Sequence, residues 1–223
     1  MLILTVLPVQ LSSQNISKMQ KRYCMALDLR NDPALIRQYK HVHTKEGIWP
    51  EIPRGIKEVG ISDMEIYLLG TRMFMILEAP LLWDYDKEMA RLGKLEKQPE
   101  WSDYVWQFQQ LLPEDKEGVK WIQLEKINQM HPAGQNETPK SGYTEPIYKQ
   151  PTKRLCAMLD VSDNPHQVDT YRHYKAPAGV IDMQIYMIGT RLYMVMETQT
   201  DFKWNKKMKW ELMDNVFDLN RDF

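Results

Sequence analysis

The stretch Asp63-Met-Glu-Ile-Tyr-Leu-Leu-Gly-Thr-Arg-Met-Phe-Met-Ile-Leu-Glu78 contains two bulky apolar runs on either side of Gly70-Thr71. A two-residue loop with glycine at its first position favours the type II′ turn, whose twist matches that of two paired strands. The pattern therefore predicts an antiparallel hairpin with strands over 61–69 and 72–78.

This hairpin sequence occurs twice in the chain. Asp182-Met-Gln-Ile-Tyr-Met-Ile-Gly-Thr-Arg-Leu-Tyr-Met-Val-Met-Glu197 matches it almost residue by residue. Upstream, Lys21-Arg-Tyr-Cys-Met-Ala-Leu-Asp-Leu29 matches Lys153-Arg-Leu-Cys-Ala-Met-Leu-Asp-Val161. Because an internal repeat of this kind indicates a duplicated structural unit, we predict two similar domains in tandem.

The second copy is shorter than the first. It has no residues that correspond to 49–51, and Lys175 stands where the first copy has His43. It also shows no counterpart of the apolar segment over 119–127, so we predict that it lacks both its catalytic segment and its last strand. The expected divisions are an unstructured leader over 1–18, a complete domain over 19–130, a linker rich in Pro, Gly, Asn and Thr over 131–152, and the truncated copy over 153–223.

Around the hairpin, apolar runs predict a buried strand over 23–29 and a half-exposed final strand over 119–127. Asp32-Pro33 is typical of a helix start, because the carboxylate caps free N–H groups and proline fits the first turn. Apolar residues at helical spacing predict further helices from Leu82 and from Pro99. The resulting order, β-α-β-β-α-β, is that of ferredoxin-like α+β folds.

A ferredoxin-like sheet has helices on one face and leaves the other face open. Two such sheets commonly close face to face into a dimeric α+β barrel. We therefore expect either a homodimer or an intrachain pseudo-dimer of the two copies. The mouth of such a barrel is a natural site for a small molecule.

The composition favours a globular protein of the cytoplasm. The formal net charge of -1 argues against a nucleic-acid partner or an anionic membrane surface. The apolar run over 1–9 is too short to span a bilayer and has no basic residue before it. Cys24 and Cys156 lie inside strand-like runs without a secretory signal, so we predict two buried free thiols in a reducing compartment.

Polar and aromatic residues are concentrated between Tyr39 and Glu51. Tyr39 and His43 are four residues apart, which places a phenol and an imidazole on the same face of the predicted helix. Gly47 is expected to end that helix, and Trp49 precedes a proline, so the chain restarts there in an extended or turn conformation. The segment therefore predicts a titratable cluster at a helix end beside an aromatic wall.

These motifs together resemble those of one known family. The first copy resembles the L-rhamnose mutarotase family over 21–127, and the resemblance implies a dimeric α+β barrel without a cofactor. It also implies an enzyme that interconverts the α and β anomers of a free 6-deoxyhexose. The matching features are Tyr39-x-x-x-His43, Ile48-Trp49-Pro50-Glu51-Ile52, the strand at Ile66-Tyr67, and Pro99-Glu-Trp101 followed by Tyr104.

The resemblance also implies roles for individual residues. His43 corresponds to the family's proton donor, Tyr39 to a residue that contacts the sugar, and Trp101 to an aromatic residue of the pocket. Met64 and Ser102 depart from the pattern, because a second tyrosine and a second tryptophan stand there in rhamnose enzymes. L-rhamnose, L-fucose and related sugars all fit what remains. Two further residues have supporting roles, Trp49 as apolar surface and Glu51 as a group that orients His43 or caps the next helix.

Imidazole suits this chemistry. Mutarotation breaks and remakes the bond between the anomeric carbon and the ring oxygen, and one proton must leave the anomeric hydroxyl while another reaches the ring oxygen. An unperturbed histidine has a pKa near 6.5, so both of its protonation states are populated near neutral pH. No metal or nucleophile is needed.

Other interpretations of the same residues stay open. Tyr39, Trp49 and Trp101 also fit an ordinary aromatic core, and the fold also serves non-catalytic sugar-binding or interaction proteins. Another small barrel enzyme, such as a cofactor-free oxygenase, is a third class. His41, His43, Glu46 and Glu51 match no common zinc spacing, so we predict no metal site.

Overall fold

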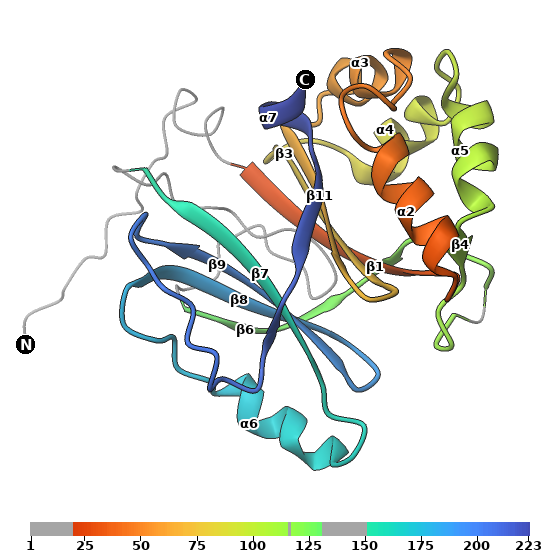
Figure 1. Ribbon diagram of the computed structural model, residues 1–223. Coiled ribbons are helices and arrows are strands. Elements are labelled where there is room, and N and C mark those ends of the chain that lie inside the picture. The colour runs from red at the N-terminus through yellow and green to blue at the C-terminus, as the bar shows by residue number, and fades with distance from the viewer. Residues whose placement is uncertain (1–19, 116, 131–150) are drawn as a thin grey trace, which may run out of the picture.

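The computed structural model of the 223-residue chain describes residues 20–115, 117–130 and 151–223. It consists of two curled antiparallel sheets that pack against each other, with helices on their outer sides (Figure 1). The predicted leader over 1–18 and almost all of the predicted linker over 131–152 lie outside the described residues. None of the described helices is long and apolar enough to cross a bilayer.

The first sheet contains the predicted hairpin. Asp63 pairs with Glu78 and Leu69 with Arg72, and Gly70 adopts the positive φ of 58° that a first loop position in a type II′ turn requires. The sheet order is β11-β2-β3-β1-β4, and β5 also pairs with β1. Its strands from the first half are β1 (Gln20–Leu29), β2 (Asp63–Leu69), β3 (Arg72–Pro80), β4 (Gln109–Gln110) and β5 (Ile122–Gln123).

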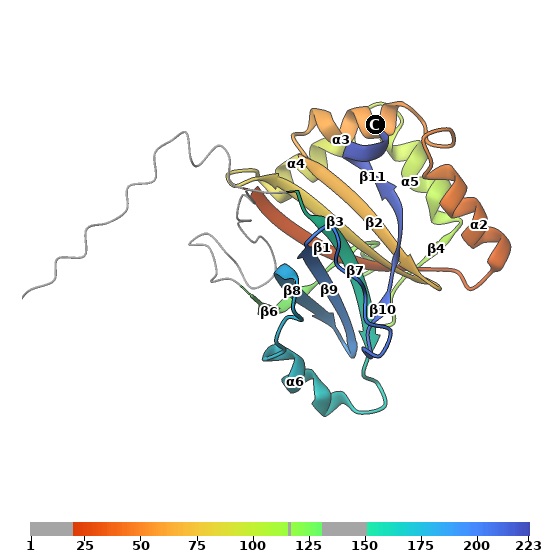
Figure 2. The ribbon, with the colours of Figure 1, turned by 60° about the vertical axis from the view of Figure 1, so that its left-hand side comes forward.

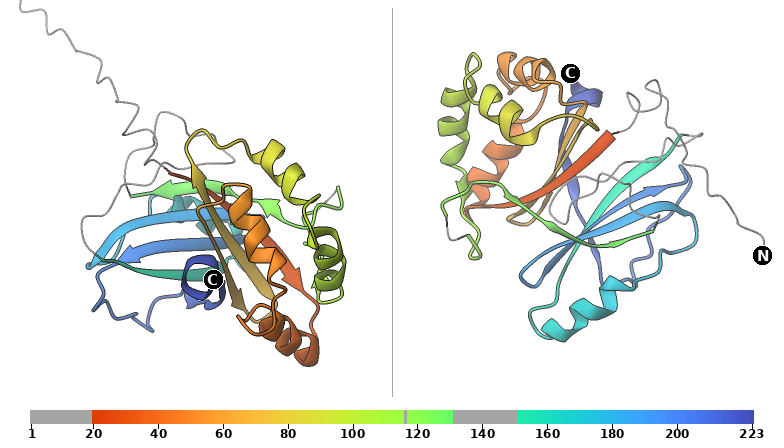
Figure 3. Two further views of the ribbon diagram at one scale, coloured as in Figure 1. Left: turned by 90° about the horizontal axis from the view of Figure 1, so that it is seen from above. Right: turned by 180° about the vertical axis from the view of Figure 1, so that it is seen from behind.

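The helices of the first half cover the outer face of this sheet (Figures 2 and 3). The predicted helix start is confirmed, because Asp32 accepts hydrogen bonds from the N–H groups of Ala34 and Leu35. Leu82 lies before the helix that it was expected to open, and it is 81% exposed. The helices are α2 (Pro33–Val42), α3 (Glu51–Glu58), α4 (Tyr85–Leu92) and α5 (Gln98–Trp106).

The first of these helices is shorter than expected. It ends at Val42, and His43 is its C-cap, so Gly47 does not end the helix. Gly47 instead lies in the following turn, where a Cβ atom would come within 2.1 Å of the His41 carbonyl oxygen. Glycine is required there by this close approach of two backbone segments.

The second sheet is also antiparallel and is formed mainly by strands from the second half of the chain. Its order is β10-β7-β9-β8-β6, and among the described residues a short helix, α6, covers it together with a 3-10 turn, η1 (Figure 1). The elements are β6 (Glu125–Gln129), β7 (Lys153–Asp160), η1 (Pro165–Gln167), α6 (Val168–Arg172), β8 (Val180–Ile188), β9 (Arg191–Thr198) and β10 (Glu211–Leu212).

The two halves exchange their last strands. The expected single strand over 119–127 is divided, because β5 pairs with β1 in the first sheet whereas β6 crosses over and pairs with β8 in the second. In return, β11 (Asp214–Asp218) leaves the second half and pairs with β2 of the first sheet, and the short helix α7 (Leu219–Asp222) follows it. Each half therefore supplies an edge strand to the other.

This exchange corrects the prediction that the second half lacks its last strand. Trp121-Ile-Gln-Leu-Glu aligns without a gap with Trp210-Glu-Leu-Met-Asp. The Leu124 N–H donates to the Cys24 carbonyl and the Met213 N–H to the Cys156 carbonyl, at 2.9 and 3.0 Å. The similarity of these two segments is hard to recognise from the sequence, because only the tryptophan is identical in both. The backbone hydrogen bonds of the two segments are nevertheless equivalent.

The faces that the two sheets turn toward each other are mainly apolar. Phe74 from β3 stacks on Tyr193 from β9 with ring centroids 5.1 Å apart. Cys24 and Cys156 lie in the same cluster, and both are buried free thiols as predicted. Burial raises the pKa of Cys24 to about 12, which keeps its thiol protonated near neutral pH.

Charged residues join the two sheets at one edge of this interface. Arg22 and Arg154 each contact Glu78 at 2.8 Å, and Arg154 also pairs with Glu197. Asp63 lies beside this network, 3.7 Å from Arg154. Burial and the carboxylates of Glu65 and Glu78 raise the pKa of Asp63 to about 7. The ionised form of Asp63 therefore opposes folding.

We expect the substitution Asp63→Asn to stabilise the protein at about pH 8. Because the pKa of Asp63 is higher in the folded than in the unfolded state, ionisation of this carboxyl destabilises the folded protein. The destabilisation is complete above about pH 7 and absent below about pH 4. Removing that charge is expected to raise the free energy of unfolding by about 2 kcal/mol at alkaline pH. Thermal unfolding at about pH 8 and about pH 5 measures this. An equal loss of stability at both values would contradict the account.

Candidate active site

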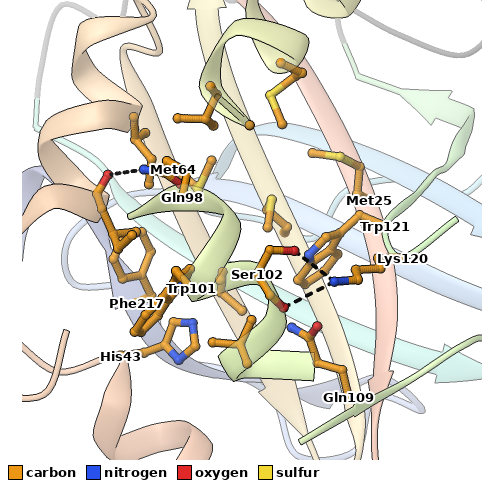
Figure 4. A pocket seen from close by; sticks show the side chains of 18 of the residues that line it. Met25, His43, Met64, Gln98, Trp101, Ser102, Gln109, Lys120, Trp121 and Phe217 are labelled. Carbon is orange, nitrogen blue, oxygen red and sulfur yellow. Dashed lines mark hydrogen bonds between the residues drawn. The ribbon is translucent and has the colours of Figure 1, made fainter. Parts of the chain in front are cut away.

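A cavity of about 260 Å³ lies between the first sheet and the helices that cover it. Most of its wall is apolar, and the polar side chains that face it come from α2 and its C-cap, α4, α5, β4 and the segment before β5 (Figure 4). A pocket with mainly apolar walls and a few polar groups is typical of small-molecule sites. The polar or titratable residues that line it are Tyr39, His43, Tyr85, Gln98, Ser102, Gln109, Lys120 and Trp121.

His43 is fixed at the C-terminal end of α2. Its Nδ1 atom lies 2.8 Å from the Tyr39 carbonyl oxygen, and since a carbonyl only accepts, Nδ1 carries the proton and donates it. The side chain is 5% exposed, and burial lowers the pKa of His43 to about 4. The ring is therefore neutral at physiological pH, and its Nε2 atom has a free lone pair.

Tyr39 lies directly beside this imidazole. The two ring centroids are 4.1 Å apart, as the four-residue spacing on one helix face predicts. Tyr39 is fully buried, and its hydroxyl oxygen has no hydrogen-bond partner among the described residues, although the Gln109 amide lies near it. Because burial raises the pKa of Tyr39, the phenol stays protonated and can donate a hydrogen bond into the cavity.

Trp101 forms the aromatic wall. Its ring lies 5.5 Å from that of His43 in an edge-on arrangement. Trp49 does not line the cavity, but it packs edge-on against the outer side of Trp101 at 5.3 Å and stacks on Tyr104 at 5.5 Å. Glu51 lies in the first turn of α3, where a carboxylate suits the helix dipole, and it makes no described hydrogen bond to His43. Trp49 therefore supports Trp101, and Glu51 belongs to the helix start.

Met64 and Ser102, the two positions that depart from the family pattern, both line the cavity. Six other lining residues that Figure 4 labels were not predicted from the sequence, and no motif pointed to them. They are Met25, Gln98, Gln109, Lys120, Trp121 and Phe217.

Phe217 comes from the second half of the chain. It lies on the exchanged strand β11, is 2% exposed, and its ring centroid is 6.1 Å from that of His43. The gapless alignment of Trp121 with Trp210 would have predicted a strand here, because it pairs Asn128 with Phe217. The cavity is thus built from both halves, although every titratable group in it belongs to the first.

The equivalent place in the second half is occupied differently. There the Asn128 side-chain amide donates to the carbonyl oxygens of Tyr171, Arg172 and Tyr174 at 3.0, 2.9 and 3.2 Å. Trp210 packs edge-on against Tyr171 at 5.4 Å. Aromatic rings packed edge-on and an amide bound to backbone carbonyls therefore lie there.

One group of carboxylates lies close enough together to hold a cation. Among the residues that the structure describes, Asp63, Glu65 and Asp218 bring one oxygen each within 4.8 Å of one another. This group is at the interface between the sheets and does not line the cavity around His43.

A comparison with protein families finds a match in the half that contains His43. The family model for L-rhamnose mutarotase matches residues 22–130. An L-fucose mutarotase of Xanthomonas campestris pv. campestris is 33% identical over 107 residues, which are 48% of this chain and 86% of the relative. The chain belongs to the L-rhamnose mutarotase family.

Two other known proteins also align with this chain. A UPF0734 protein of Dictyostelium discoideum is 35% identical over 111 residues, which are 48% of this chain and 87% of the relative. Among solved structures, a putative monooxygenase from Fusobacterium nucleatum subsp. nucleatum aligns with 90% of this chain and 94% of its own, at 8% identity and a TM-score of 0.39. A similarity at that level does not establish a shared fold. The mutarotase match ends at residue 130, before the strand that carries Phe217.

Proposed function

We propose that this protein is a sugar mutarotase that interconverts the α and β anomers of a 6-deoxyhexose of the L-rhamnose or L-fucose type. The observation that carries the proposal is a buried neutral imidazole in a cavity of about 260 Å³, within the segment that matches the family. Trp101 offers a flat apolar face to the C–H bonds of a pyranose, which supports a sugar as the occupant.

The chemistry begins with His43 as a base. Its Nε2 atom takes the proton of the anomeric hydroxyl while the bond from the anomeric carbon to the ring oxygen breaks and the aldehyde forms. The imidazolium then gives that proton to the former ring oxygen, and closure on the other face of the aldehyde reverses both steps. The resemblance implies a proton donor at His43, but the bond from Nδ1 to the Tyr39 carbonyl favours acceptance first.

Tyr39 and the aromatic residues assist this step. The protonated Tyr39 phenol donates a hydrogen bond to an oxygen of the sugar near His43. Met64 and Phe217 close the apolar side of the cavity and exclude water. Exclusion of water lowers the barrier to proton transfer, because hydrogen bonds to developing charge are stronger at low dielectric constant.

We further propose that the chain is an intrachain pseudo-dimer of two ferredoxin-like units. The second unit, over 153–223, lacks the histidine and acts as a structural partner. Its main contribution to the site is strand β11, which brings Phe217 to His43. The matched strand order of the two sheets and the reciprocal exchange of β6 and β11 support this arrangement.

NMR saturation transfer between the anomers of L-fucose and L-rhamnose tests the function. The intact chain is expected to accelerate exchange of at least one of these sugars above the rate in buffer. A non-catalytic sugar-binding protein would instead bind the sugar in a calorimetric titration without any acceleration. Absence of both binding and acceleration would reject the sugar as ligand altogether.

The pH dependence of exchange is expected to differ from that of an ordinary histidine enzyme. A histidine with an unperturbed pKa of about 6.5 loses half of its basic form at that pH. Because burial lowers the pKa of His43 to about 4, the base stays available as the pH falls. We expect kcat/KM to be level from about pH 8 down to about pH 5 and to fall only below that. A midpoint near 6.5 would contradict this assignment.

A further inference from the structure

Among the described residues that line the cavity, Lys120 is the only lysine or arginine, none is a carboxylate, and His43 is neutral. It lies in the segment just before β5. Figure 4 shows Lys120 and His43 on opposite sides of the cavity, with Trp101 and Ser102 between them. A cation at the end of an apolar cavity costs free energy unless a partner balances its charge.

The ammonium group is held in place. Its Nζ atom donates to the Ser102 hydroxyl at 2.8 Å and to the Ser102 carbonyl at 3.2 Å, and it lies 5.1 Å from the centroid of the Trp106 ring. An ammonium has three N–H donors, so one stays free after these two bonds. The lysine is thus positioned, and it can still bind a further acceptor.

The described part of the chain places no acidic side chain against this lysine. Among the residues that the structure describes, Lys120 has no carboxylate within ion-pair distance, and the Ser102 and Trp106 contacts are its described interactions. Half-buried charges beside apolar surface are normally paired, because desolvation without a counter-ion costs free energy. The missing counter-ion is therefore expected to come from the molecule that occupies the cavity.

We propose that the Lys120 end of the cavity binds a carboxylate, so that the site accepts sugars of the hexuronic acid class as substrates. The proposal rests on the proposed mutarotase function and extends it. A hexuronic acid keeps the hemiacetal of a neutral sugar, so the same proton transfer at His43 opens and closes its ring. No oxidation or group transfer is involved.

The charge and the size of the cavity favour a carboxylate over a phosphate. One ammonium balances the single negative charge of a carboxylate, whereas a phosphate ester carries about 1.5 to 2 charges near neutral pH. The cavity of about 260 Å³ has room for one pyranose ring with a small substituent. The Ser102 hydroxyl, held beside Lys120, adds a second polar contact at the same end.

The test compares hexuronates with the neutral sugars that differ from them only at C6. Anomer exchange of D-glucuronate, D-galacturonate, L-guluronate and L-iduronate is measured by saturation transfer with the intact chain, each beside its own hexose. We expect at least one hexuronate to be exchanged roughly tenfold faster in kcat/KM than its neutral counterpart. Sodium chloride is expected to reduce this ratio, because ion pairs are screened by salt.

Three variants identify the group responsible. In Lys120→Met the ratio of hexuronate to hexose exchange is expected to fall roughly tenfold, and in Lys120→Arg, which keeps the charge, most of the ratio is expected to remain. Lys87→Met removes an exposed lysine on α4 as a matched control and is expected to leave the ratio unchanged. Circular dichroism checks that each variant is folded.

The outcomes separate this proposal from the mutarotase function. If L-fucose or L-rhamnose is exchanged but every hexuronate equals its hexose, or if Lys120→Met keeps the ratio, the carboxylate site is overturned and the mutarotase remains. If no sugar is exchanged at all, the mutarotase function falls, and calorimetric titration with the hexuronates decides. Binding that Lys120→Met abolishes would support the carboxylate site, and no binding would overturn it.

Discussion

A chain that ends at Met208 is expected to lose anomer exchange completely, down to the rate in buffer. The deletion removes β10, β11 and α7, although every titratable residue of the proposed site is still present. Without β11 the edge of β2 loses its partner and the cavity loses Phe217, so water enters beside His43. Saturation transfer measures the loss. Substantial exchange by the shortened chain would contradict a site built from both halves.

A milder change separates loss of the site from loss of the fold. Phe217→Ala removes one ring from the cavity while the pairing of β11 with β2 stays intact, and truncation of a buried phenylalanine typically costs about 3–5 kcal/mol of stability. We expect this variant to stay folded at low temperature and to exchange sugars markedly more slowly. Leu212→Ala on β10, the preceding strand in the sequence, is the matched control, because Leu212 is exposed and does not line the cavity.

Replacement of His43 by Gln is the second change with a large expected effect. Glutamine retains an N–H that can donate to the Tyr39 carbonyl, but it cannot accept and return a proton near neutral pH. We expect kcat to fall by about 10² to 10⁴, which is the usual range for loss of general acid–base catalysis. Sugar binding is expected to change little, because the cavity walls are preserved.

His41→Gln is the matched control for this substitution. His41 lies two residues away in the same helix, and its side chain is exposed. The control is expected to exchange sugars at the rate of the unaltered chain. Equal losses in both variants would point to damage of α2 and not to proton transfer. An active His43→Gln variant would assign the chemistry to another group.

Local sequence patterns predicted much of the first half. The hairpin around Gly70, the helix start at Asp32 and the meeting of Tyr39 with His43 all follow from short-range spacing, which a single sequence displays directly. The end of α2 was misplaced because Gly47 is required by its approach to the His41 carbonyl, a contact that no local pattern reveals.

Local sequence patterns could not predict the strand exchange between the two sheets. Alternating apolar residues over 119–127 indicate a strand, but they do not say which sheet it joins, and the chain changes sheets at Leu124. For the same reason Phe217 was not expected near His43, since only the pairing of β11 with β2 brings it there. Lys120 lies in the predicted half-exposed strand, and its contact with Ser102 depends on packing across the cavity.

The account depends on one buried, neutral imidazole that moves a proton on a bound sugar. Saturation transfer between the anomers of L-fucose, recorded near neutral pH with equal concentrations of the intact chain and of His43→Gln, tests this most directly. The account predicts accelerated exchange with the intact chain and a rate close to that of buffer with the variant. Equal exchange rates in the two samples would contradict it.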